Sequence, residues 1–378
     1  MKYMLLLLIF IPLASTQGQT IRINYDIDTA TYNVGAPLQL WMNFLEAGDD
    51  SISSKYWSAA EVEKYGRDSY FLIERELNFG TKNYLKLMNY ATVTILSIRK
   101  LGDYYKINSL MEFPGKDSIT SNIQYIYNVY AGEENGELKL FNPLKINTDI
   151  NLNSTTVGFI RFHYLKTHTF DEVLAKKQND FLVDFAKHFE VPTDTIDYYF
   201  APTREELAQI RGFDFIIGIN GEEIPSGRAD ATGRIVYSSG LAEYYPHEFI
   251  HILLYPHYPN GHWWIHEGVA TYFGLSRGKE LNWQLERLNR HLAKHPEINL
   301  DTMLQYRTVD QFTDYSYALG GWVVQKAYEK GGYGLVKKLL NSGKTSEDFY
   351  AAIEEHLGIK QEGLDETIKA ELKVTFGD

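Results

Sequence analysis

Three residues whose chemistry suits a metal site lie together in the segment His247-Glu248-Phe249-Ile250-His251. On an α-helix, residues i and i+4 lie on one face one turn apart, so both imidazoles can reach one tetrahedral metal ion. Glu248 lies about 100° further round such a helix, beside the metal rather than on it. A carboxylate in that place can accept a proton from a metal-activated water. The spacing therefore predicts a hydrolytic metal site with Glu248 as the general base.

A third protein ligand is needed if one coordination position is to stay open to water, and Glu267 is the favoured candidate. Residues 255–261 contain two prolines and an Asn-Gly turn signal, so a second helix can begin near Trp263 and carry Glu267. The small residues Gly268 and Ala270 would let this helix pack closely against the first. Two histidines and one glutamate favour zinc over calcium or magnesium, which prefer oxygen ligands.

Other histidines are alternatives for the third ligand. His257 stands where the third histidine of a metzincin would stand, but Leu254 fills the position where that family needs glycine. A left-handed leucine costs about 1–2 kcal/mol. His262 lies in the predicted loop, and His266 points about 100° away from the neighbouring Glu267. The alternative without a metal is a buried amphipathic helix whose histidines only form hydrogen bonds. Burying two histidines and a glutamate on one apolar helix would then cost free energy.

The paired motifs HEFIH and WWIHEGVATYF resemble the gluzincin metallopeptidases, particularly the aminopeptidase-like lineage whose second helix has the form W-x-x-E-G-x-A-T. The resemblance covers roughly residues 152 to 378. It implies that His247, His251 and Glu267 bind zinc and that Glu248 activates water. Residues 225–234 lack the G-x-M-E-N element that anchors a free amino terminus in aminopeptidases, so that specificity is not implied.

The same resemblance suggests roles for two further segments. Residues 314–322 are similar to the Y-x-K-G segment of aminopeptidase-type gluzincins, which implies that Tyr317 stabilises the oxyanion. Leu319 stands in place of the lysine, and Tyr315 is the alternative donor. The strand predicted at 233–239 corresponds to the sheet edge that pairs with an extended peptide substrate in gluzincins, although an ordinary edge strand would have the same pattern.

Composition excludes several classes of protein. The chain has 378 residues, a net charge of −12 and no dense run of Lys or Arg, which argues against nucleic-acid binding. The absence of cysteine excludes disulfides, thiolate metal sites and a lipid-modified N-terminal cysteine. Residues 1–18 predict a secretory signal peptide that is too short for a stable membrane anchor. We therefore expect a secreted or periplasmic protein with no membrane span in the mature chain.

The pattern of apolar residues predicts the α+β class and two domains. Segments with helical spacing precede segments with alternating apolar residues, at 35–47, 53–64 and 68–77 for helices and at 92–98, 104–111 and 123–129 for strands. Together with the Phe44–Asp49 segment, this order resembles the cone-shaped SnoaL-like fold and implies an accessory domain at 20–148. An Asn/Thr-rich stretch at 147–155 predicts a linker.

The domain predicted at 152–378 combines a small sheet, the HExxH helix and a helical C-terminal lobe. Its first part predicts strands at 156–164 and 195–200 around a helix at 170–189, and Thr203 with Glu206 forms a capping box that starts another helix. In the C-terminal lobe, Gly331-Gly332 predicts a break between helices at 316–331 and 333–341.

Two function hypotheses from different classes follow. The preferred one is a secreted zinc peptidase that acts on a peptide or protein substrate. The other is a non-catalytic, zinc-containing module that binds peptides at the cell envelope. The presence of Glu248, which a binding module would not need, favours the peptidase.

Overall fold

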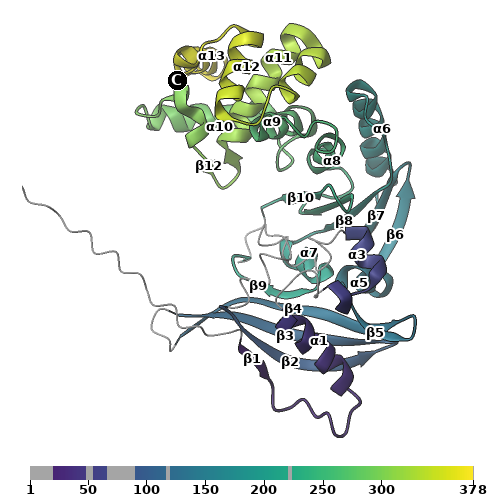
Figure 1. Ribbon diagram of the computed structural model, residues 1–378. Coiled ribbons are helices and arrows are strands. Elements are labelled where there is room, and N and C mark those ends of the chain that lie inside the picture. The colour runs from purple at the N-terminus through teal and green to yellow at the C-terminus, as the bar shows by residue number, and fades with distance from the viewer. Residues whose placement is uncertain (1–19, 48–53, 66–89, 116–119, 220–223, 378) are drawn as a thin grey trace, which may run out of the picture. The chain divides into compact units, whose positions relative to one another are not determined.

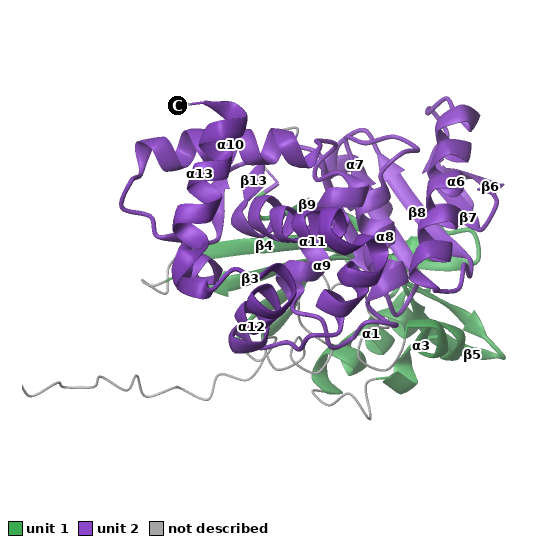
Figure 2. Cartoon of the chain, turned by 90° about the horizontal axis from the view of Figure 1, so that it is seen from above, with its two compact units in different colours: residues 1–146, 211–218 green, residues 147–210, 219–378 purple. Residues whose placement is uncertain are grey.

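The computed structural model describes residues 20–47, 54–65, 90–115, 120–219 and 224–377 (Figure 1). The predicted signal peptide and the helix predicted at 68–77 lie outside these residues. The chain divides into two compact units: residues 1–146 with 211–218, and residues 147–210 with 219–378 (Figure 2). Both units combine helices with β-sheet, so the protein is of mixed helix and sheet type, compatible with the predicted α+β class.

The first unit is built on one sheet with the strand order β1-β2-β3-β4-β5, to which β9 is added beside β4. Its strands are β1 (Thr20–Ile23), β2 (Thr92–Leu101), β3 (Tyr104–Pro114), β4 (Ser121–Glu134), β5 (Glu137–Phe141) and β9 (Phe213–Ile216). Helix α1 (Gly35–Ala47) buries Trp41, whose indole N–H donates to Ser109 Oγ at 3.1 Å. The helix predicted at 53–64 is two pieces, η1 (Ser54–Tyr56) and α3 (Ala59–Tyr65).

The linker predicted at 147–155 is wrong at the level of secondary structure. These residues form the end of helix α5 (Pro143–Asn151) and most of strand β6 (Leu152–Val157). Strand β6 pairs along its whole length with β7 (Ile160–Leu165), and it is polar because it is an edge strand with exposed positions. The division after residue 146 lies close to the predicted boundary between 148 and 152. The predicted ranges did not include the return of residues 211–218 to the first unit through strand β9.

The second unit contains a sheet with the strand order β10-β11-β8-β7-β6. Helix α6 (Glu172–Phe189) connects the parallel strands β7 and β8 (Ile196–Ala201), and its Leu182 and Phe185 are buried in the same core as the sheet residue Tyr198. Helix α7 (Arg204–Ile210) begins with the predicted capping box, in which Thr203 and Glu206 bond each other's backbone N–H. The apolar periodicity of these elements explains why the sequence predicted them.

The strand at the edge of this sheet differs from the prediction. Strand β11 (Ile235–Ser239) lies inside the sheet, between β8 and β10 (Ser226–Asp230). Strand β10 is therefore the edge strand at this end of the sheet, and β6 is the edge strand at the other end. The sequence of β10, Ser-Gly-Arg-Ala-Asp, has no alternation of apolar residues, so periodicity could not reveal it.

Helices form most of the remainder of the second unit. They are α8 (Pro246–Leu254), α9 (Trp263–Gly274), α10 (Leu281–Lys294), α11 (Tyr315–Leu340), α12 (Ser346–Leu357) and α13 (Leu364–Phe376), with the short helices η3 (Leu300–Gln305) and η4 (Gln361–Gly363) and the strands β12 (Thr308–Asp310) and β13 (Thr313–Asp314). The break predicted at Gly331-Gly332 is a kink within α11. Among the described residues, no helix is long and apolar enough to cross a membrane.

Helix α9 lies unusually close to α11. A Cβ atom on Gly268 would lie 2.2 Å from the carbonyl oxygen of Gly320, and a Cβ on Gly320 would lie 2.4 Å from the carbonyl oxygen of Trp264. These close atoms belong to the backbone, which cannot move aside as the end of a flexible side chain can. Both positions therefore require glycine. This contact positions α9 and, with it, Glu267.

We expect Gly268→Ala to lower the free energy of unfolding by about 1–3 kcal/mol or more, because the added methyl group meets backbone. Gly334→Ala is the matched control: the same change in α11 meets open space and should be neutral or stabilising by up to about 1 kcal/mol. Urea denaturation of the two variants measures the difference. Equal stability of both variants would contradict the proposed close packing of α9 and α11.

Candidate metal centre

Helix α8 carries the two histidines of the HExxH motif. Pro246 occupies its first turn, and every residue of the helix is buried. His247 and His251 therefore face the inside of the second unit, with 3% of each residue exposed. A helix this apolar would bury two imidazoles only at a cost unless both find polar partners or a metal.

Helix α9 brings Glu267 to the same place. The side chain of His262 caps its start by accepting a hydrogen bond from the backbone N–H of Trp264. His247 Nε2 lies 3.4 Å from one Glu267 oxygen, and His251 Nε2 lies 3.6 Å from the other. These distances exceed the usual length of a hydrogen bond, as expected for groups that surround a common ion. Among the described residues, His247, His251 and Glu267 form a group whose ligand atoms all lie within 4.8 Å of one another.

The hydrogen bonds around the two imidazoles suit metal binding. His247 Nδ1 donates to the carbonyl oxygen of Leu275 at 2.7 Å, which leaves Nε2 with a free lone pair. The His251 ring stacks on Tyr255 with the centroids 4.9 Å apart, and its Nδ1 is buried without a hydrogen-bond partner in the described part of the chain. Unless Nε2 binds a metal, His251 would bury both ring nitrogens without a good hydrogen bond. The residues present therefore fit a metal ion.

Within this group Glu267 is the residue most accessible to solvent, since its side chain is 20% exposed compared with 3% and 4% for the two histidines. Burial raises the pKa of Glu267, but the neighbouring His251 and His247 outweigh it and hold that pKa well below its usual range. Glu267 is thus an anionic ligand. Two imidazoles and one carboxylate are the ligand set typical of a hydrolytic zinc site.

Glu248 lies beside this group rather than in it. The residue is 8% exposed, and burial raises the pKa of its carboxyl group above the usual value. Tyr245 donates a hydrogen bond to Glu248 Oε1 at 3.4 Å. A Cβ on Gly227 would lie 2.6 Å from Glu248 Cγ, so the edge strand β10 runs directly past this carboxyl group. A raised pKa suits a group that must both accept and return a proton near neutral pH.

The alternative third ligands lie elsewhere. His257 is exposed in the turn after α8 and is not a member of the group. The His262 ring packs against Phe349 with the centroids 4.8 Å apart, and His266 Nε2 bonds the carbonyl oxygen of Tyr258 at 3.0 Å. Thus the geometry brings Glu267, and none of these three histidines, to the imidazoles of α8.

The two candidate tyrosines have different surroundings. Tyr317 meets the His247 ring edge-on with the centroids 5.8 Å apart, and burial together with the Glu267 charge raises the pKa of its hydroxyl, which therefore stays protonated. Tyr315 stacks on Tyr306 at 5.1 Å, away from the metal ligands. Leu319, in the position of the expected lysine, is fully buried. The sequence analysis missed the contacts of Tyr245 with Glu248 and of Tyr255 with His251. The chain has 28 tyrosines, and nothing in the sequence distinguishes these two from the others.

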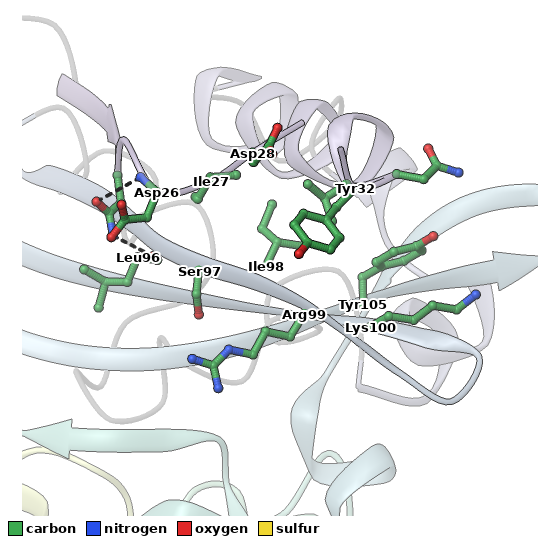
Figure 3. Close-up of a pocket in the computed structure, with 13 residues that line it drawn as sticks. Asp26, Ile27, Asp28, Tyr32, Leu96, Ser97, Ile98, Arg99, Lys100 and Tyr105 are labelled. Carbon is green, nitrogen blue, oxygen red and sulfur yellow. Dashed lines mark hydrogen bonds between the residues drawn. The ribbon is translucent and has the colours of Figure 1, made fainter. Parts of the chain in front are cut away.

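A cavity of about 730 Å³ lies in the first unit, and none of the candidate site residues line it (Figure 3). Residues 24–34 form one wall and strand β2 the other, with Tyr32 directed toward Ile98. Asn24 and Asp28 use side-chain atoms to bond Leu96 O and the backbone of residues 30 and 31. These polar groups serve the loop itself, so the cavity presents no convergent set of catalytic groups.

Comparisons with known proteins leave the family open. No protein-family model matches the chain, and no curated protein matches its sequence. The functional argument therefore depends on the residues and the geometry described above.

The purified protein should bind about one zinc ion per chain, as two histidines and one glutamate with an open position require. Glu267→Ala removes one of three ligands and should lose most of the metal, whereas His257→Ala should keep it. Elemental analysis after dialysis, together with zinc titration of the stripped protein, measures both. Loss of zinc in His257→Ala with retention in Glu267→Ala would exclude the described ligand set.

Proposed function

We propose that the protein is a zinc-dependent peptidase of the gluzincin type, which hydrolyses peptide bonds with Glu248 as the general base. The observation that carries the proposal is the convergence of His247, His251 and Glu267 with a buried Glu248 beside them. In this proposal the second unit is the peptidase domain, and the first unit is a SnoaL-like accessory domain. The signal peptide predicted at residues 1–18 would direct the protein to the periplasm or the exterior.

A zinc ion held by these ligands would activate water and polarise the substrate carbonyl group. Glu248 accepts the proton of the attacking water, for which its raised pKa and its place beside the ligands suit it. The same carboxyl group then returns the proton to the leaving amine. Tyr245 restrains Glu248 through its hydrogen bond, and Gly227 leaves the room that the carboxylate needs.

Two further features support a peptide as the substrate. Strand β10 is the edge of its sheet and passes Glu248, so its outer backbone groups can pair with an extended chain. The protonated hydroxyl of Tyr317, next to His247, can donate to the carbonyl oxygen as that oxygen becomes negative. The first feature suits the backbone of an extended peptide, and the second suits the carbonyl oxygen of its amide bond. A protein that only binds a metal ion would need neither.

Glu248→Gln should keep its zinc, because the substituted group is not a ligand, and should lower hydrolysis of a peptide mixture by at least about a hundredfold. Zinc content and single-turnover rates measure the two effects separately. Full activity with zinc bound would show that another group is the base. If the wild-type protein binds zinc and peptides but cleaves none, the non-catalytic binding module is the better description.

Tyr317→Phe should lower kcat more than it raises KM, because the hydroxyl acts mainly in the transition state. The loss should be about 3 kcal/mol, the size expected for one oxyanion donor. Tyr315→Phe is the matched control, since this residue packs on Tyr306 and should leave kcat near the wild-type value. A large loss in Tyr315→Phe alone would move the role two residues upstream.

A further inference from the structure

Trp263 is an exposed aromatic residue next to the metal centre. It begins helix α9 and stands one turn before Glu267, on the same face of that helix. Trp263 is 43% exposed, whereas the next two residues, Trp264 and Ile265, are 0% and 1% exposed. A tryptophan that keeps this much surface in water beside a reactive site is a candidate for contact with a ligand.

Arg307 lies over the ring of Trp263. Its Cζ atom is 5.4 Å from the centroid, within the range of a cation–π contact. The residue is exposed, and no carboxylate or other hydrogen-bonding partner of its guanidinium group occurs in the described ranges. By contrast, Arg161, Arg287 and Arg290 each have a carboxylate partner, and the chain as a whole carries a net charge of −12.

The backbone of Arg307 is tied to the catalytic region. Its carbonyl oxygen accepts a hydrogen bond from the N–H of Tyr315 at 2.9 Å, at the start of α11. Two residues further along α11, Tyr317 meets the ring of His247. The backbone of Arg307 is therefore tied to the helix that also carries Tyr317, and the N–H groups of its guanidinium remain able to donate to a ligand.

An arginine beside an indole ring can still bind a carboxylate with two parallel hydrogen bonds. One helical turn separates Trp263 from Glu267 by about 6 Å along the axis. Side chains on one face of an extended peptide repeat at about 7 Å. A carboxylate at Arg307 would thus belong to a residue within about one to three positions of the bond that is cleaved.

We propose that Arg307 and Trp263 form a subsite that binds a carboxylate of the peptide substrate, either an acidic side chain or the C-terminal carboxylate. The inference rests on the proposed peptidase function and adds a substrate class to it: peptides with a negative charge close to the cleaved bond. It also accounts for an unpaired arginine in an acidic protein.

Matched peptides test the subsite. A first set of pairs compares Glu with Gln at one position at a time, for each of the three positions on either side of the cleaved bond. A further pair compares a free with an amidated C-terminus. The wild-type protein should cleave one acidic member with a kcat/KM about ten- to hundredfold higher than its neutral partner, the range expected for charged hydrogen bonds. The pair that shows the preference identifies the source of the carboxylate.

Arg307→Gln should abolish this preference and leave kcat/KM for the neutral peptides within about twofold. The matched control is Arg290→Gln, which removes an equal charge from an exposed arginine on α10 that pairs with Glu286, and it should keep the preference. Trp263→Leu should weaken the preference less than Arg307→Gln, because the charge remains without its aromatic support.

The subsite is overturned if the wild-type protein cleaves acidic and neutral peptides equally, or if Arg307→Gln lowers both rates by the same factor. Zinc-loaded Glu248→Gln, alone and combined with Arg307→Gln, allows the binding of the same peptides to be measured by calorimetry without turnover. If no peptide is cleaved, the peptidase proposal fails, and this comparison still decides on the subsite. Equal or absent binding of acidic and neutral peptides to zinc-loaded Glu248→Gln would then reject it.

Discussion

Helix α9 packs between α8 and α11, and it contacts their backbones at glycine positions where a larger side chain would not fit. The metal centre depends on this packing. Gly268 meets the backbone of Gly320 on one side. On the other side, a Cβ on Gly274 would lie 3.0 Å from the backbone nitrogen of His247. Interaxial distances between helices depend on the side chains at the contact, so glycine allows the closest approach. The approach of α9 to α8 brings Glu267 within reach of both histidines.

The same region places two carboxyl groups in different electrostatic surroundings. The pKa of Glu267 lies well below its usual range because His251 and His247 outweigh the effect of burial. The pKa of Glu248 is raised, chiefly by burial, although the same histidines oppose that effect. Two carboxyl groups whose pKa values are pushed apart are suited to different tasks, here those of the proposed metal ligand and the proposed proton acceptor.

Short-range patterns in the sequence were sufficient for much of the helical framework and for the choice of candidate ligands. The i, i+4 spacing of His247 and His251 defines one face of a helix, whatever the helix packs against. Helix α6 and the capping box at Thr203 were predicted because periodicity and capping are local properties. Glu267 was preferred to His257 from the turn chemistry between the two helices, and the structure brings Glu267 to the histidines.

The larger errors of the sequence analysis involve strands. Strand β10 has no apolar alternation, the polar strand β6 was interpreted as a linker, and strand β9 joins a sheet whose other strands lie far away in the sequence. Strand pairing is a contact between distant segments, so one strand's own residues do not specify its neighbour.

By itself, the sequence determined the residue types, their helical spacing and hence the chemistry available to them. Only the tertiary structure decided that Gly227 runs past Glu248, that Tyr317 rather than Tyr315 meets His247, and that Arg307 covers Trp263. The physical reason is that each of these contacts joins residues in segments that are not consecutive along the chain. Their approach is set by the packing of the whole core, which no local pattern encodes.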